Sequence, residues 1–187
     1  MISSNSIKDS GYTRYPLSSL LIYNGVTLLH YLLGGFGIML GYSFSWPAYL
    51  LGALYLAFAF IQMYILMPFM VCPNCVYYKL KDSLCISGLN IVAKKVAPAG
   101  TINDFAKRGE GLLCHNNLYL TAKIFPLLAM LPGLILNFSM ALLVIFLVVV
   151  GLLLFRIFVI FPKVACVHCR AKNICPNAKS MGLSREN

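Results

Sequence analysis

Residues 140–169 read MALLVIFLVVVGLLLFRIFVIFPKVACVHC, a long apolar run followed by a proline and a Cys-x-x-Cys pair. Residues 46–75 read WPAYLLGALYLAFAFIQMYILMPFMVCPNC and end in the same way. The motif Pro-x-x-x-Cys-x-x-Cys therefore occurs twice, starting at Pro68 and at Pro162. Because about 20 apolar residues are enough to cross a bilayer as a helix, both stretches are predicted membrane spans that end at a pair of cysteines.

The composition is that of an integral membrane protein, with the lipid bilayer as its first expected partner. The chain has 187 residues, of which 60% are hydrophobic and 11% are charged, whereas a soluble domain carries roughly 25% charged residues. No Asp, Glu, Lys or Arg occurs from Tyr15 to Tyr78 or from Ile124 to Phe155. The first apolar run is longer than the roughly 7–15 residues of a signal-peptide core, so we expect it to remain as an anchor.

Four transmembrane helices account for the two apolar regions. The first region divides at residues 42–47, which gives spans near 17–42 and 46–70. The second region, 118–161, would rise about 66 Å as one helix, roughly twice the thickness of the hydrocarbon core. Two spans near 118–136 and 138–161 fit better, joined by a turn at Pro132-Gly133 or at Asn137.

The predicted fold is an all-α integral membrane protein whose four transmembrane helices form two helical hairpins. Each hairpin leads into a proline, a cysteine pair and a third cysteine, Cys85 or Cys175. Two spans return the chain to its starting side, so the halves can be parallel pseudo-repeats. The expected segments are an N-terminal segment (1–16), hairpin 1 (17–70), a cysteine-rich loop (71–117), hairpin 2 (118–161) and a cysteine-rich C-terminal tail (162–187).

The basic residues predict the orientation. The short connections inside the hairpins carry no charge, and the positive-inside rule places the other connections in the cytoplasm. Lys123 and Arg156 fall inside apolar segments, where we expect them to snorkel to that same face. We therefore expect a multi-pass protein of the cell membrane, with no nucleic-acid partner, since no basic–aromatic binding motif occurs. The remaining basic residues are Lys8, Arg14, Lys79, Lys81, Lys94, Lys95, Lys107, Arg108, Lys163, Arg170, Lys172, Lys179 and Arg185.

All seven cysteines fall outside the predicted spans, on the face expected to be cytoplasmic. The reducing cytosol disfavours stable disulfides, and paired Cys-x-x-Cys motifs are typical of tetrahedral metal sites. One grouping joins both pairs in a four-thiolate site, with a second site drawn from the other cysteines and a histidine. Another gives each half its own centre. Zinc and an iron–sulfur cluster both suit such ligands. The candidate ligands are Cys72, Cys75, Cys85, Cys114, Cys166, Cys169, Cys175, His115 and His168.

Two features of the first span are further candidates. His30 lies near its middle, where an ionisable residue is a candidate cofactor ligand. No second histidine lies in another predicted span to complete a haem site, so haem and quinone are not favoured. We expect His30 to bond a neighbouring helix, through Gln62. Gly37-x-x-x-Gly41 matches the small-residue motif of close helix packing, which is also compatible with a homodimer.

These patterns favour a membrane-anchored module that binds a metal through cysteine ligands. We expect it to transfer electrons to or from a membrane or cytoplasmic redox partner. The alternatives are a zinc-stapled scaffold that binds a partner, a handler of soft metal ions, and a thiol-redox protein. No nucleotide-binding or catalytic motif occurs. Whether the chain is an enzyme therefore stays open, and an enzyme of this kind would be an oxidoreductase.

Overall fold

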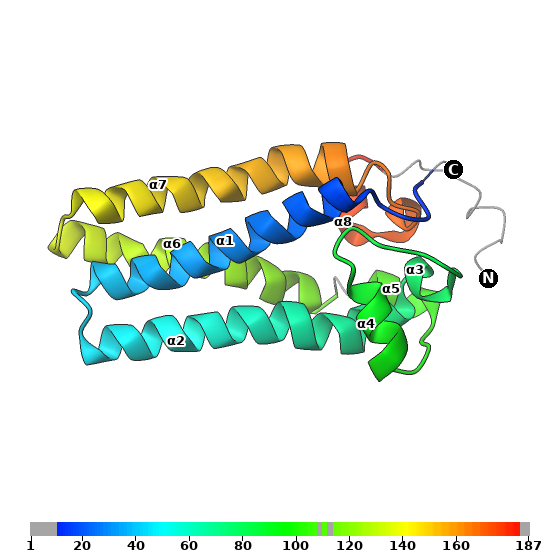
Figure 1. The fold of residues 1–187 in the computed structure, drawn as a ribbon, viewed down its shortest axis with the longest axis horizontal. Helices are drawn as coiled ribbons and strands as arrows, with labels where there is room; N and C mark the ends of the chain where they lie inside the picture. Colours follow the sequence, from blue (N-terminus) through cyan, green and yellow to red (C-terminus); the bar gives the residue numbers. More distant parts are fainter. Residues whose placement is uncertain (1–10, 108–109, 112–113, 184–187) are drawn as a thin grey trace.

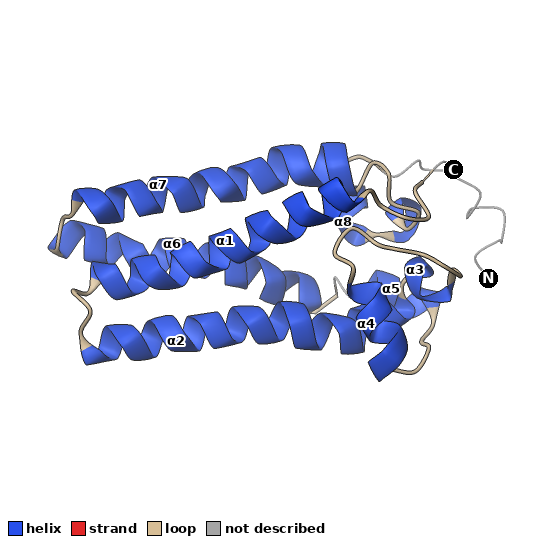
Figure 2. Cartoon of the chain, viewed as in Figure 1, coloured by secondary structure: helices blue, strands red, loops and turns tan. Residues whose placement is uncertain are grey.

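Four long helices dominate the structure. The computed structural model describes residues 11–107, 110–111 and 114–183, and this part of the chain is helical, with one isolated bridge between Arg14 and Leu84 and no β-strand (Figure 2). Four helical stretches are long and apolar enough to cross a membrane, which confirms the all-α fold and the multi-pass membrane protein. They are α1 (Leu17–Gly41), α2 (Trp46–Phe60) continued by η2 (Ile61–Val71), α6 (His115–Leu136), and α7 (Met140–Phe155) continued by η4 (Arg156–Ala165).

The two short connections lie at one end of the bundle and the small helices at the other (Figure 1). Residues 42–45 join α1 to α2, and residues 137–139 join α6 to α7. Of the two predicted turn positions, Asn137 is the correct one, since Pro132 lies inside α6. The short helices are η3 (Cys72–Asn74), α3 (Val76–Lys79), α4 (Leu89–Val96), α5 (Ile102–Lys107), η5 (Lys172–Ile174) and α8 (Pro176–Ser180).

Three of the basic residues used for the orientation, Lys8, Arg108 and Arg185, lie outside the described residues. The same holds for most of the expected N-terminal segment and for the last four residues of the expected tail.

Helix α1 is central and packs against α2, α6 and α7. Its glycines allow this, because they let a neighbouring backbone approach closely. A Cβ atom added to Gly133 of α6 would lie only 2.7 Å from the carbonyl oxygen of Gly41. The predicted small-residue packing is therefore confirmed, within one chain. Gly37 and Gly41 are buried there, so a homodimer, which stays a prediction, would need another face.

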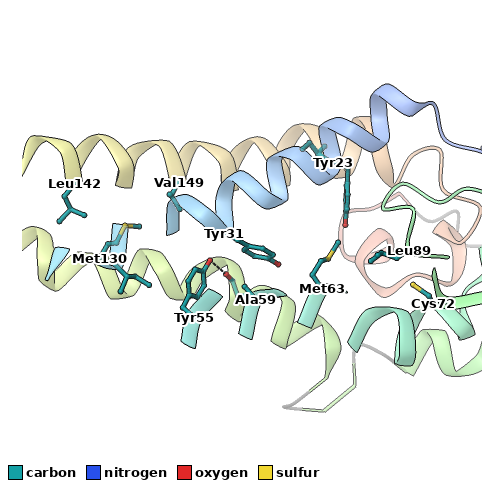
Figure 3. Close-up of a cluster of buried hydrophobic side chains, with 14 residues drawn as sticks. Tyr23, Tyr31, Tyr55, Ala59, Met63, Cys72, Leu89, Met130, Leu142 and Val149 are labelled. Carbon is teal, nitrogen blue, oxygen red and sulfur yellow. Dashed lines mark hydrogen bonds between the residues drawn. The ribbon is translucent and has the colours of Figure 1, made fainter. Parts of the chain in front are cut away.

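The core runs the whole length of the bundle. Buried apolar side chains extend from Leu142 and Met130 near the two short turns to Cys72 at the opposite end (Figure 3). The outward faces of the four long helices carry exposed Leu, Ile, Val and Phe side chains. Apolar residues outside as well as inside are what a lipid-facing bundle requires, because lipid replaces water around it.

The contact between Gly41 and Gly133 gives a first prediction. Gly133→Ala should lower the stability of the protein in detergent by about 1–3 kcal/mol, because the added methyl group pushes α6 away from α1. The measurement is thermal unfolding in a neutral detergent. Gly151→Ala is the matched control, since a Cβ there meets nothing within 4 Å. Equal stability of the two variants would contradict the close contact.

Candidate functional site

Each cysteine pair follows a π-helical segment that contains a proline. Pro68 lies inside η2 and Pro162 inside η4. Proline has no N–H and its ring clashes with the carbonyl four residues earlier, and the wider π-helix relieves this conflict. The backbone N–H of the first cysteine in each pair then donates to the carbonyl five residues earlier. Cys72 donates to Met67, and Cys166 donates to Phe161. The two copies of the motif thus share one local backbone form.

The Cys-x-x-Cys turns are also alike. Cys75 N–H donates to the Cys72 carbonyl at 3.1 Å, and Cys169 N–H donates to the Cys166 carbonyl at 3.1 Å. In the second pair, the backbone N–H of Ala171 donates to the Cys169 sulfur at 3.4 Å. This bond orients the Cys169 side chain within the turn.

Six of the seven cysteines line a single cavity at this end of the bundle. Its volume is about 140 Å³, and each half of the chain contributes three cysteines. Among residues 11–107, 110–111 and 114–183, no three His, Cys, Asp or Glu side chains are arranged as a group that could hold a metal ion. The candidate ligands that line the cavity are Cys72, Cys75, Cys85, Cys166, Cys169, Cys175 and His115.

The two remaining candidate ligands have other surroundings. Cys114 precedes α6 as its N-cap, and its sulfur accepts a hydrogen bond from the Asn117 N–H at 3.4 Å. His168 stacks on Tyr12, with ring centroids 4.5 Å apart. Neither residue lines the cavity.

The segment just before α1 ties the two cysteine pairs together, which the sequence did not indicate. Tyr12 N–H donates to the His168 carbonyl at 2.9 Å, and the Tyr12 carbonyl accepts from the Tyr77 hydroxyl at 2.7 Å. The Tyr15 hydroxyl donates to the Ala165 carbonyl. Burial, together with the nearby Cys169 thiol, raises the pKa of Tyr15 and of Tyr77 above the usual range. Both phenols therefore stay neutral and act as donors.

His30 is buried, as expected, but its predicted partner is wrong. Its Nε2 lies 3.0 Å from the backbone carbonyl oxygen of Lys123 in α6, and a carbonyl can only accept, so Nε2 carries the hydrogen. The side-chain amide nitrogen of Gln62 (Nε2) instead forms a hydrogen bond with the ring nitrogen Nε2 of His115, at 3.2 Å. His30 thus joins α1 to α6, while Gln62 links η2 to a histidine of the cavity wall.

Snorkelling of Lys123 and Arg156 is also wrong, because both side chains point into the bundle. Their exposed fractions are 1% and 2%. The Lys123 ammonium lies 3.8 Å from the ring centroid of Tyr31, and the Arg156 guanidinium carbon lies 4.4 Å from that of Tyr23. Both cations also face the ring of Tyr119, at 5.7 and 5.4 Å. Snorkelling fails because the helix faces that carry these residues turn inward.

Ring contacts alone do not offset the burial of these charges. A cation–π contact contributes about 2 kcal/mol when desolvated, whereas an unpaired buried charge costs several kcal/mol per ion. The sequence contains no Asp or Glu at positions 10–81 or 111–185, so no acidic side chain of the four spans can serve as counter-ion. The two cations are therefore the most costly feature of the bundle interior.

The polar residues of the interior lie at helical spacing. Tyr23, Thr27 and Tyr31 recur every four residues on α1, and His115, Tyr119 and Lys123 recur every four residues on α6. Residues four apart share a helix face. This periodicity inside otherwise apolar spans could have revealed the buried polar layer from the sequence. The layer extends from the cavity into the bundle, since Tyr23, His115 and Tyr119 also line the cavity.

The chain matches no known family model, no curated protein and no solved structure at a significant level. The four long apolar helices are those of a multi-pass helical membrane protein. Its function has to be inferred from the cavity and the residues around it.

Loss of the Tyr15 hydroxyl gives a second prediction. Tyr15→Phe should lower stability by about 1–3 kcal/mol, because the buried carbonyl of Ala165 loses its donor. Alkylation of Cys166 and Cys169 by iodoacetamide should also become faster, as measured by mass spectrometry of the labelled protein. Tyr12→Phe is the control, since it keeps the ring that stacks on His168. Unchanged labelling in Tyr15→Phe would show that this bond does not hold the second cysteine pair.

Proposed function

We propose that the chain is a membrane-anchored module that holds a cysteine-ligated metal centre in the cavity. One observation carries the proposal, which is that six cysteines from both halves line the same cavity. Thiolates in this number are the ligands of zinc and of iron–sulfur clusters. The centre would draw its ligands from both halves, so its loading would bring sulfurs together and lock the two pairs.

The size of the cavity favours a cluster over a single ion. One water-sized sphere occupies about 10–15 Å³, and the cavity has room for several, with a volume of about 140 Å³. A zinc ion with four thiolates at roughly 2.3 Å is closed in by its own ligands and leaves no such space. An iron–sulfur cluster is therefore the leading candidate. When bound, it would supply one-electron transfer to a redox partner.

The proposal also takes the two halves as helical hairpins related by parallel pseudo-symmetry, with the cavity on the cytoplasmic side. The matching π-helical segments and cysteine turns support the symmetry. The exposed basic residues of the described loop and tail support the orientation, since they gather at the end of the bundle that carries the cysteines.

The metal is tested by anaerobic purification of the full chain, followed by its visible spectrum and by assays for iron, zinc and acid-labile sulfide. Broad absorption near about 400 nm with iron and sulfide is expected. A colourless protein with one or two zinc ions would instead support a zinc-stapled scaffold, in which the metal locks the two halves for a partner. Protein without stoichiometric metal would refute both.

Single cysteine variants test whether both pairs share the centre. Cys72→Ser and Cys166→Ser should each remove the same metal almost completely, because each breaks one shared site. Retention of about half of the metal in each variant would mean separate centres. Cys114→Ser is the matched control, since Cys114 does not line the cavity and serine is itself a good helix N-cap. It should keep the full metal content.

Fusion reporters test the orientation. A fluorescent protein at the C-terminus should fluoresce and an alkaline phosphatase at the same point should be inactive, because the positive-inside rule keeps this end in the cytoplasm. Fusions at residue 44, in the turn between α1 and α2, should give the opposite pair of results. Agreement of both positions with each other would contradict the four-span topology, in which α2, α6 and α7 separate residue 44 from the C-terminus.

A further inference from the structure

The buried cations lack hydrogen-bond partners for most of their donors. Among the described residues, Lys123 Nζ, Arg156 Nε, Arg156 Nη2 and the Tyr31 hydroxyl are buried and make no hydrogen bond. Arg156 does use its third nitrogen, since Nη1 donates to the Thr27 hydroxyl. An ammonium and a guanidinium edge are thus left unsatisfied in a region where burial makes this costly.

The unsatisfied edge of Arg156 has the geometry of an anion-binding fork. In a guanidinium group the N–H bonds of Nε and Nη2 point in the same direction, and such a pair binds a carboxylate or a phosphate through two parallel hydrogen bonds. The bond from Nη1 to Thr27 fixes the plane of the group and leaves this edge available. An arginine stays charged even when buried, so an anion is the ligand that would satisfy both its two N–H donors and its charge.

Lys123 adds a second basic group to the same region. The ring of Tyr119 lies 5.7 Å from the Lys123 Nζ and 5.4 Å from the Arg156 guanidinium carbon. No acidic residue exists in the four spans to neutralise them. Two basic side chains therefore share one buried region without an acidic partner, and a bound anion would favour the charged form of both.

The cavity ends against the aromatic side chains that cover Arg156. The rings of Tyr23, Tyr119 and Phe161 line the cavity, and the Arg156 guanidinium packs on the same three rings, at 4.4, 5.4 and 5.2 Å from their centroids. The cations thus lie directly behind the aromatic inner wall. An anion that enters among the cysteines meets this wall first.

We propose that Arg156 and Lys123 form a binding site for an oxyanion of the phosphate or carboxylate class, behind the aromatic inner wall of the cavity. The Nε–Nη2 edge of Arg156 holds two of its oxygens, and the Lys123 ammonium balances its charge. Neither the proposed metal centre nor its identity is needed for this site. The source of the oxyanion is either a solute from the cytosolic side or the headgroup of an acidic lipid.

The experiment uses the full chain in a neutral detergent, stripped of metal and delipidated. Anion binding is then measured independently of any metal centre. Thermal unfolding and titration calorimetry are recorded with sodium phosphate, sodium acetate and sodium chloride at equal ionic strength. A saturable rise in unfolding temperature with phosphate or acetate, and none with chloride, is expected. An equal response to chloride would overturn the proposal, because chloride has only one atom for the fork.

Variants assign the binding to the two cations. Lys123→Met and Arg156→Met should each weaken oxyanion binding at least tenfold, and Arg156→Lys should weaken it too, since it keeps the charge but loses the fork. Lys163→Met is the matched control, with the same change at an exposed position two turns along η4, and should bind as the unmodified chain does. Binding that survives both Met variants would overturn the site.

Stability in the absence of any anion separates this role from a purely structural one. Lys123→Met should be at least as stable as the unmodified chain, because it removes a buried charge without a partner, yet it should lose the stabilisation by the oxyanion. If the lysine served only to pack against Tyr31, the variant would be less stable and would keep that stabilisation. This readout holds even if Arg156→Met fails to fold.

A lipid arm identifies the source. Mixed micelles with phosphatidic acid are compared with micelles of phosphatidylcholine at the same content. Stabilisation by phosphatidic acid and not by inorganic phosphate assigns a lipid headgroup, and stabilisation by inorganic phosphate assigns a solute. No stabilisation by phosphate, acetate or phosphatidic acid would overturn the proposal.

Discussion

The close approach of α1 and α6 is the contact on which the rest of the structure depends. Helices in lipid gain little from hydrophobic burial and associate through tight packing instead. Gly41 and Gly133 bring the two backbones together at one end, and farther along the same pair His30 bonds the Lys123 carbonyl. This pairing sets the polar face of α1 opposite the polar face of α6, so the interior of the bundle becomes polar where the two faces meet.

The second constraint comes from the prolines near the ends of two spans. Each one forces its helix into a wider π-helical form just before the cysteines. As a result, both halves form the same Cys-x-x-Cys turn, and both turns lie at the same end of the bundle. Because the segment of Tyr12 and Tyr15 bonds both halves, the cysteines face one shared cavity instead of two separate surfaces.

The cavity and the buried cations lie next to each other, separated by aromatic rings. Six cysteines and His115 line the cavity, Gln62 bonds His115, and Arg156 and Lys123 lie behind the aromatic wall. A thiolate centre carries negative charge, as does the oxyanion that we infer. The positive interior would therefore favour both. This arrangement gives a physical reason for placing two costly cations in an apolar bundle that has no acidic residue.

The sequence by itself determined the four spans, the first turn and the clustering of cysteines at one end, because apolar length and proline position act locally. It left the second turn open between Pro132-Gly133 and Asn137. It also indicated the glycine packing. It did not determine the partner of His30, the inward direction of Lys123 and Arg156, or the separation of Cys114 and His168 from the other candidate ligands. Those depend on how each helix is rotated against its neighbours. The spacing of polar residues marks one face of α1 and one of α6, but only tertiary packing decides which neighbour each face meets. A span that is apolar on nearly every face, such as α7, carries little local signal for which side turns inward.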